Sequence, residues 1–330
     1  MKLILAPMRG ITNAIFRKIY CEHFPYFDYA VAPFVSPTIS QNLGKGLFKD
    51  LSPKENENSM PVEPQILLNN PDVLYPFLDK IFVLGYKKVN INMGCPANVV
   101  VKKNKGAALL ENLDLIDKIL SKIAEDKRFE FSVKLRLGMT NKRRIFDILP
   151  IIEKYEPSVI IVHPRTADMQ YSGEANIDIF QEVTQNVKSN IIYNGDVFSL
   201  AKYKKINALF GEKIVGVMLG RGALVNPLLC GQIKEKKFQN PEIEIKKFID
   251  NLYFEYEKLY FGERSVLGKM KELWKYLQFS FENSKKCAKK ILKSESLYFY
   301  RKHCDELFEN CKYFCNNETL GNIQMDGVIE

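Results

Sequence analysis

The chain has 330 residues, of which 46% are hydrophobic and 26% are charged, enough for one large core and a smaller second unit. No stretch reaches the ~18 apolar residues of a membrane span, and Pro7 stops the apolar N-terminal run short of a signal sequence, so we expect a cytoplasmic protein without a membrane contact. The net charge of +9 is a weak indication of a polyanionic partner.

Short apolar runs rich in β-branched residues predict eight strands. They are Leu3–Ala6, Tyr29–Ala32, Gln65–Leu68, Val89–Asn92, Phe131–Leu135, Val159–His163, Ile191–Asn194 and Gly216–Leu219. Most of the segments between them carry apolar residues at helical spacing, for example 113–123 and 145–152. Eight alternating strands and helices in about 230 residues predict an α/β fold of the (β/α)₈ TIM-barrel type, with a doubly wound open sheet as the alternative.

The pattern changes after Pro227, because no convincing strand follows residue 242 and the apolar residues take helical spacing. We therefore predict a catalytic barrel over 1–238, a small all-helical domain over 242–315 and a tail over 316–330. From Arg264 to Lys302 the sequence has eleven Lys or Arg and three Glu. This basic run indicates either an RNA-binding surface or a solvated helical face.

Polar clusters stand at or just after the ends of six predicted strands. They are Pro7-Met8-Arg9, Asn92–Pro96, Lys134 with Arg136, His163–Thr166, Asn194-Gly195-Asp196 and Gly220-Arg221-Gly222. In a (β/α)₈ barrel these ends converge on the one face that carries active sites. Gln65 is the exception, because it opens its predicted strand.

The Gly220-Arg221-Gly222 segment follows the last strand, where barrels of this kind commonly bind phosphate. A tight turn without a ligand is the alternative. No G-x-G-x-x-G segment is present, which favours a mononucleotide such as FMN over FAD or NAD.

Two titratable side chains on the strands need partners inside a barrel. Lys134 alternates with Ser132 and Arg136, so we expect it to face inward toward an anion or an electron-rich ring. The alternatives are that it faces outward or pairs with a carboxylate. His163 ends an apolar strand next to Arg165, and a core histidine held by one hydrogen bond is the alternative to a site residue.

Cys95 is the sharpest candidate among seven cysteines. Their odd number in a long chain argues against a disulfide framework. His303, Cys304, Cys311 and Cys315 match no common zinc spacing, so we expect no metal. Cys95 stands in a polar Gly-Cys-Pro turn near Asn90 and Asn92, without metal-ligand or protease partners nearby. The remaining roles for Cys95 are those of an acid and of a nucleophile.

Together, these motifs resemble the FMN-dependent tRNA-dihydrouridine synthase family, as a divergent bacterial subgroup. The matching segments are Ala6-Pro7-Met8, Asn90–Pro96, Ser132–Gly138, His163–Thr166, Asn194-Gly195-Asp196 and Met218–Gly222. The resemblance is strong over residues 3–230 and looser over Leu267–Trp274. The chain departs from the family at Asn90, where Asp is usual, and at Pro164, where a small residue such as Gly is usual.

The resemblance implies roles for these residues. Cys95 matches the family's catalytic cysteine, and Asn92 matches the residue that places the target base. The implied FMN contacts are Pro7, Met8 and Arg9 at the flavin border, Gln65 and Lys134 on the ring, His163 beside it, and Asn194, Gly195, Asp196, Gly220 and Arg221 on the ribityl chain and phosphate. The expected reaction passes a hydride from FMN N5 to uracil C6 and a proton from Cys95 to C5, with NADPH or NADH as reductant.

We expect the protein to be a monomer. We expect its substrate to be tRNA, with rRNA as the alternative. The candidate substrate contacts, in addition to Asn92, are Arg136, Arg165, Tyr171, Arg264, Lys269 and Lys271. The competing functions are an FMN barrel oxidoreductase on a small molecule, such as a dihydroorotate dehydrogenase or an ene-reductase, and a non-catalytic RNA-binding protein. The basic helices argue against the first, and the pair Cys95 and Lys134 argues against the second.

Overall fold

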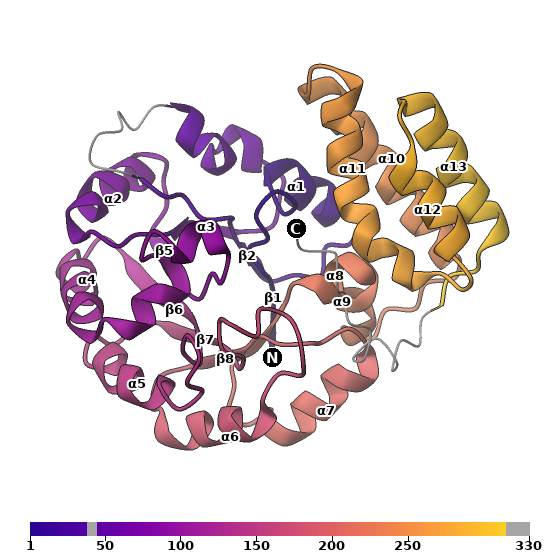
Figure 1. The fold of residues 1–330 in the computed structure, drawn as a ribbon. Coiled ribbons are helices and arrows are strands. Elements are labelled where there is room, and N and C mark those ends of the chain that lie inside the picture. The colour runs from indigo at the N-terminus through magenta and orange to yellow at the C-terminus, as the bar shows by residue number, and fades with distance from the viewer. Residues whose placement is uncertain (38–44, 315–330) are drawn as a thin grey trace.

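The computed structural model describes residues 1–37 and 45–314. Strands and helices alternate around a closed ring, and four further helices stack beside it (Figure 1). The strands are β1 Lys2–Leu5, β2 Tyr29–Val31, β3 Val62–Glu63, β4 Gln65–Ile66, β5 Lys88–Met93, β6 Glu130–Arg136, β7 Val159–His163, β8 Ile191–Tyr193 and β9 Gly216–Leu219. The predicted (β/α)₈ barrel with a helical C-terminal region is confirmed.

The strands form one parallel sheet in the order β3-β2-β1-β9-β8-β7-β6-β5-β4. β3 and β4, at the two ends of that order, are consecutive in the chain with only Pro64 between them. β3 and β4 together therefore form the third strand of the barrel, interrupted at Pro64, which has no N–H to donate to the sheet. Val35 also pairs with Ile66, which helps to close the ring.

The third predicted strand, Gln65–Leu68, is displaced in the structure. The interrupted strand begins at Val62, so Gln65 lies in its second half and is not its first residue. A proline and a charged Glu63 hide the strand from a search for apolar runs.

The barrel helices cover the outside of the strands. They are α1 Ala14–His23, α2 Leu74–Val83, α3 Asn98–Val101, α4 Leu113–Glu125, α5 Ile145–Glu153, α6 Ile177–Asn186, α7 Leu200–Phe210, α8 Arg221–Val225 and α9 Leu229–Ile233. Short 3₁₀ helices complete the ring: η1 Lys45–Leu51, η2 Lys54–Asn56, η3 Pro71–Val73 and η4 Gly106–Glu111. Several helices begin at side-chain caps; for example, the Asn112 and Ser199 side chains accept hydrogen bonds from the first turns of α4 and α7.

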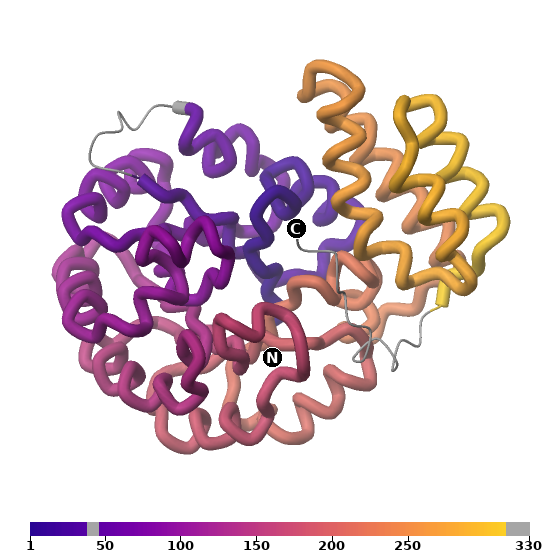
Figure 2. Tube along the Cα trace, viewed as in Figure 1, coloured from indigo at the N-terminus to yellow at the C-terminus, as the bar shows by residue number. Residues whose placement is uncertain are grey.

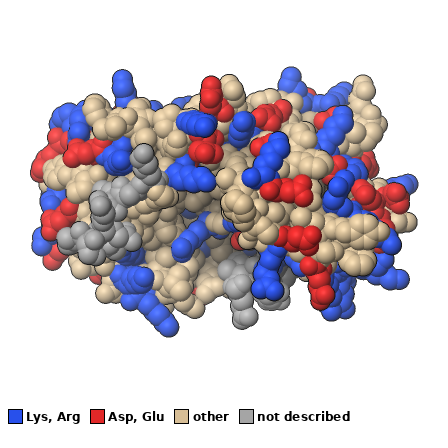
Figure 3. All heavy atoms as spheres, turned by 90° about the horizontal axis from the view of Figure 1, so that it is seen from above, with Lys and Arg blue, Asp and Glu red and all other residues tan. Residues whose placement is uncertain are grey.

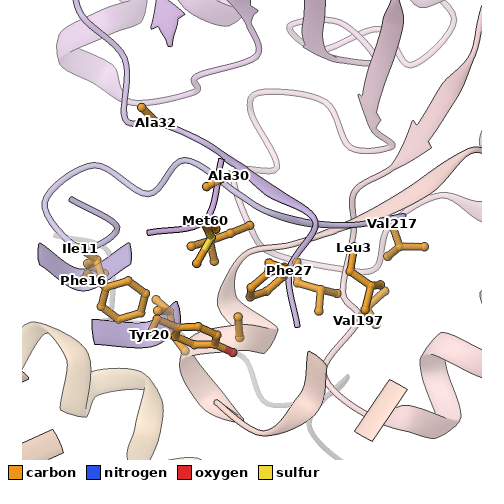
Figure 4. Packing of buried hydrophobic residues seen from close by; sticks show 14 of the residues in the cluster. Leu3, Ile11, Phe16, Tyr20, Phe27, Ala30, Ala32, Met60, Val197 and Val217 are labelled. Carbon is orange, nitrogen blue, oxygen red and sulfur yellow. The ribbon is translucent and has the colours of Figure 1, made fainter. Parts of the chain in front are cut away.

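Alternation along the strands separates two cores. In β7, Val159 and Ile161 point into the barrel, whereas Ile160 and Val162 point out toward the helices. The outer core also contains α1, part of which is drawn in Figure 4 with Phe16, Tyr20 and the nearby Phe27.

The C-terminal helices share the outer core. They are α10 Pro241–Leu259, α11 Glu263–Leu277, α12 Lys285–Lys293 and α13 Leu297–Asn310, with η5 Gln278–Ser280 between α11 and α12. The ring of Phe248 on α10 lies 5.9 Å from that of Phe16 and 5.7 Å from that of Tyr20. Apolar packing is thus continuous from α1 to α10, and the Cα trace shows α11 on the barrel side of this group (Figure 2). The boundary at 238–242 stays a prediction, and the predicted tail lies outside the described residues.

Candidate active site at the barrel mouth

A cavity of about 410 Å³ opens between the barrel mouth and α11. Its size is typical of a site for a cofactor or small ligand. The predicted residues in its wall are Pro7, Met8, Arg9, Asn92, Cys95, Lys134, Arg136, His163, Tyr171, Asn194, Gly195, Asp196, Gly220 and Arg221. The strand-end clusters thus converge as the barrel prediction requires.

Cys95 lies in the turn that follows β5. Its backbone N–H donates to Asn92 Oδ1 over 3.0 Å, and its carbonyl accepts from the Ala107 N–H over 3.0 Å. Gly106 lies against this turn with φ +61°, and a Cβ there would come within 2.7 Å of the Cys95 carbonyl oxygen. Burial raises the pKa of the Cys95 thiol, so the group is protonated at neutral pH. A protonated thiol in a fixed turn is suited to donating a proton.

Lys134 faces the cavity from β6, as its alternation predicts. Burial, followed by the charge of Arg136, lowers the pKa of its ammonium group to about 7. Across the residues that the structure describes, Lys134 makes neither a hydrogen bond nor an ion pair. Its amino group therefore points into the cavity without a counter-charge and is only partly protonated at neutral pH, so a bound anion would favour its charged form.

Three arginines gather near Asp196, and of these Arg136 and Arg221 line the cavity whereas Arg165 does not. Asp196 accepts from Arg165 Nη1 and from Arg221 Nη2, each over 2.9 Å, and from the Ala175 backbone N–H. The guanidinium carbons of Arg136 and Arg221 lie 5.3 Å and 4.4 Å from the centroid of the Tyr171 ring, within range of cation–π contacts.

Burial, with the nearby cations Arg136 and Lys134 as lesser causes, lowers the pKa of His163 well below its usual value. The ring is therefore neutral and offers one donor and one acceptor nitrogen. Its Nε2 lies 3.1 Å from Arg165 Nη1.

The turn after β9 packs against the loop after β8. A Cβ on Gly222 would lie 1.9 Å from the Val197 carbonyl oxygen, so only glycine allows this approach. The contact brings Arg221 beside Asp196, with Gly195 and Gly220 also in the cavity wall.

Charges in the cavity wall are unequal. Five basic residues, of which Lys134 is only partly protonated at neutral pH, face two carboxylates, Asp196 and Glu272. The basic residues are Arg9, Lys134, Arg136, Arg221 and Lys275. This balance favours an anionic ligand such as a phosphate ester.

Comparison with known proteins agrees with this geometry. The family model described as dihydrouridine synthase matches residues 4–311. The chain belongs to the dihydrouridine synthase family. It is 29% identical over 299 residues to the tRNA-dihydrouridine(16) synthase of Haemophilus influenzae, covering 88% of this chain and 95% of that one. It is 30% identical over 229 residues to the tRNA-dihydrouridine synthase B of Pasteurella multocida, covering 69% and 67%.

Solved structures share the fold at lower identity. Histamine dehydrogenase from Rhizobium sp. 4-9 superimposes with a TM-score of 0.54 at 9% identity, over 76% of this chain and 48% of that chain. The old yellow enzyme homologue of Zymomonas mobilis gives 0.50 at 11% identity, over 72% and 89%.

Some predicted site residues lie elsewhere than the cavity wall. Gln65 is fully buried behind Asn92. All five N–H groups of Arg165 have partners within the protein: Asp196, His163 and the carbonyl groups of Ser172 and Gly173. Their contacts with cofactor and RNA stay predictions.

The predicted RNA lysines and arginine on α11 differ in environment. Arg264 is exposed and Lys271 is half-buried. Lys269 Nζ donates to the Gly10 carbonyl oxygen and so joins α11 to the loop after β1. Its nearest partner is therefore the barrel itself.

Sequence reasoning missed the cavity residues of α11. Glu272, Lys275 and Tyr276 reach the cavity from one face of the helix, at spacings of three and four residues. The spacing was visible in the sequence, but the rotation of α11 relative to the barrel was not.

Membrane and metal sites find no support in the described ranges. Within 1–37 and 45–314, no helix is both long and apolar enough to cross a bilayer. In the same ranges, no three His, Cys, Asp or Glu side chains group as metal ligands. Cys315 falls outside the described residues.

Proposed function

We propose that this family member reduces the C5=C6 bond of uridine in tRNA to 5,6-dihydrouridine, with FMN as cofactor and NADPH or NADH as reductant. The observation that carries the proposal is a protonated Cys95 thiol in the wall of a cationic cavity at the barrel mouth. The relatives named as tRNA-dihydrouridine synthases in two bacteria support the substrate. We expect a monomer in the cytoplasm.

The residues present fit FMN. The unpaired Lys134 amino group would bind an electron-rich ring in its protonated form, and Arg221 beside two glycines suits a phosphate. We assign the phosphate and ribityl chain to Asn194, Gly195, Asp196, Gly220 and Arg221. We assign the ring to Lys134, Gln65 and His163, with Pro7, Met8 and Arg9 at its border.

Bound FMN, once reduced, would supply the hydride that adds to uracil C6. Addition at C6 builds enolate-like charge on the base, so an acid at C5 lowers the barrier. Cys95 donates that proton from its thiol and is re-protonated from solvent. The Asn92 amide, fixed by the turn, orients the base beside the thiol.

The base must leave its stack to reach this cavity, at a cost of roughly a few kcal/mol. Phosphate contacts along α11 would offset that cost, with Arg264, Lys271 and the missed Lys275 as candidates. Tyr171 and Arg136 lie in the cavity wall where an extruded base would stack. In Figure 3, basic and acidic side chains are interspersed, and basic ones border a hollow near the middle of that face.

The test uses the purified holoenzyme with NADPH and tRNA from cells that lack dihydrouridine. We expect a flavin absorbance spectrum and a gain of two hydrogens at specific uridines, measured by mass spectrometry of the digested tRNA. Orotate, a simple enone and rRNA serve as comparison substrates. Turnover of orotate or the enone with no change in tRNA would replace the proposal by the small-molecule oxidoreductase, and a colourless inactive protein would favour the non-catalytic RNA binder.

A further inference from the structure

A row of polar side chains crosses the barrel interior beneath the Cys95 turn. Glu63, Gln65, Asn90, Asn92 and Ser132 are between 0% and 6% exposed. They come from inward positions of β3, β4, β5 and β6, and strand register places Gln65 beside Asn90 and Asn90 beside Ser132. Buried polar groups are costly unless each has a partner.

Every link in the row runs in one direction. Asn92 Nδ2 donates to Gln65 Oε1 over 2.8 Å, and Gln65 Nε2 donates to Asn90 Oδ1 over 2.7 Å. Asn90 Nδ2 donates to Ser132 Oγ over 2.6 Å, and the Ser132 hydroxyl donates to the Glu63 carboxylate. The row ends at Glu63, which only accepts hydrogen bonds while it is ionised.

The other end of the row also has a fixed direction. Asn92 Oδ1 accepts from the backbone N–H groups of Gly94 and Cys95, over 3.1 Å and 3.0 Å. Backbone N–H groups can only donate, so the Asn92 oxygen must face the turn and its NH₂ must face Gln65. Both ends therefore require the same orientation of every amide between them.

We propose that Glu63 is a positioning residue for Cys95, whose ionised carboxylate holds the Asn92 amide, and with it the catalytic turn, through Ser132, Asn90 and Gln65. The inference rests on the proposed function, in which Cys95 gives the proton. A protonated Glu63 can donate to Ser132 as well as accept from it, so it no longer fixes the direction of the row. The reverse direction would set the Asn92 NH₂ against two backbone N–H donors, so one link of the row would be lost.

Glu63 changes its charge near neutral pH. Burial raises the pKa of its carboxyl group to about 7, with the Ser132 hydrogen bond and Lys88 lowering it and Glu130 raising it. Tyr29, from β2, also faces this carboxyl group, and burial raises its pKa enough to keep it neutral. The row therefore ends at a group whose charge changes near pH 7.

The test measures single-turnover reoxidation of the reduced holoenzyme by tRNA, between about pH 5.5 and 9. In the native enzyme we expect the rate to fall below a midpoint near 7. Glu63→Gln should be about tenfold slower above pH 8 and should lack that midpoint, because its amide can donate as well as accept. Flavin reduction by NADPH, which needs no proton from Cys95, is the internal control and should change much less than reoxidation by tRNA.

A relocated charge separates positioning from packing. Asn90→Asp places a carboxylate one link nearer, where it accepts from Gln65 and from Ser132 at once. The double variant Glu63→Gln/Asn90→Asp should therefore regain most of the lost rate, whereas Asn90→Asp alone buries two carboxylates and should be slower. Glu130→Gln, an exposed carboxylate at the same barrel end, should stay within about twofold of the native rate.

The rate at which iodoacetamide alkylates Cys95, followed by mass spectrometry, measures the environment of the thiol in its turn independently of catalysis. We expect its pH profile to lose the midpoint near 7 in Glu63→Gln and to keep it in Glu130→Gln. A Glu63→Gln enzyme with the native rate and profile, or a double variant no faster than the single one, overturns the role of Glu63 alone. A native enzyme that forms no dihydrouridine overturns the proposed function and this inference together.

Discussion

The two halves of the barrel interior differ in chemistry. β1, β2, β7, β8 and β9 contribute an apolar cluster that includes Ile4, Val31, Ile161, Ile192 and Met218. β3 to β6 contribute the row of hydrogen-bonded polar side chains that ends at Glu63. Apolar filling is sufficient for stability, so we expect the buried polar half to serve the chemistry proposed above it.

The largest expected effect belongs to the polar half. Cys95→Ala should lower the rate of dihydrouridine formation by about 10²- to 10⁴-fold, because the proton donor is removed. The free energy of unfolding and the flavin spectrum should change little, since the thiol lies in a turn at the cavity wall. Cys230→Ala, a buried cysteine outside the cavity, is the matched control. Full activity of Cys95→Ala would remove this thiol from the mechanism.

The apolar half should show the opposite pattern. Ile161→Ala should lower the free energy of unfolding by about 2–5 kcal/mol, and Ile161→Val by about 0.5–1.5 kcal/mol, because Ile161 is fully buried. At a temperature where the variant is folded, the pH profile of turnover should match that of the native enzyme. Chemical unfolding measures the free energy, and the activity assay measures the pH profile. A shifted pH profile in Ile161→Ala would break the separation of the two halves.

Substitution of Glu63 should show how much its buried carboxylate lowers the free energy of unfolding. Its pKa is raised from an ordinary 4.5 to about 7 in the folded protein, so the folded state holds a proton that the unfolded state releases. Stability from this group is therefore present at low pH and is lost as pH rises from about 4.5 through 7. Relative to the native enzyme, Glu63→Gln should gain about 3 kcal/mol between pH 4.5 and pH 8. Parallel stability curves of the two proteins would contradict a raised pKa.

The smallest effect concerns the surface outside both halves. Lys271→Glu should weaken tRNA binding several-fold at low salt and reduce the salt slope by about one, as expected for a lost phosphate contact. Lys269→Ala should instead lower stability, because its ammonium group bonds Gly10. Equilibrium titrations with tRNA at several salt concentrations, paired with unfolding curves, separate the two lysines. Unchanged binding in Lys271→Glu would place the RNA on another face.

The fold was largely readable from the sequence, because seven of the barrel strands are short apolar runs and six of these have polar residues at their ends. The prediction misplaced the strand around Pro64, because its inward residues are Glu63 and Gln65 rather than aliphatic side chains. For the same reason Glu63 was not a candidate for the site. A buried carboxylate is recognisable only from the hydroxyl and amide groups that surround it.

The cavity wall was readable wherever a motif ends a strand, as at Cys95, Lys134 and Asp196. The contribution of α11 was not, because the sequence states which residues share a helical face but not which way the face turns. Lys269 shows the limit: a basic residue in a basic helix bonds a backbone carbonyl of the barrel.

The contact between Lys269 and Gly10, together with the packing of Phe248 on α1, has a consequence for substrate choice. The helices that would hold the RNA backbone are fastened to the loop that borders the cavity, without an intervening linker of free length. The separation between the anchored phosphates and the extruded base is then constant. On the proposed function, we expect such an enzyme to select its uridine by its distance along the tRNA surface, with the sequence around the target base acting through the shape it gives the RNA.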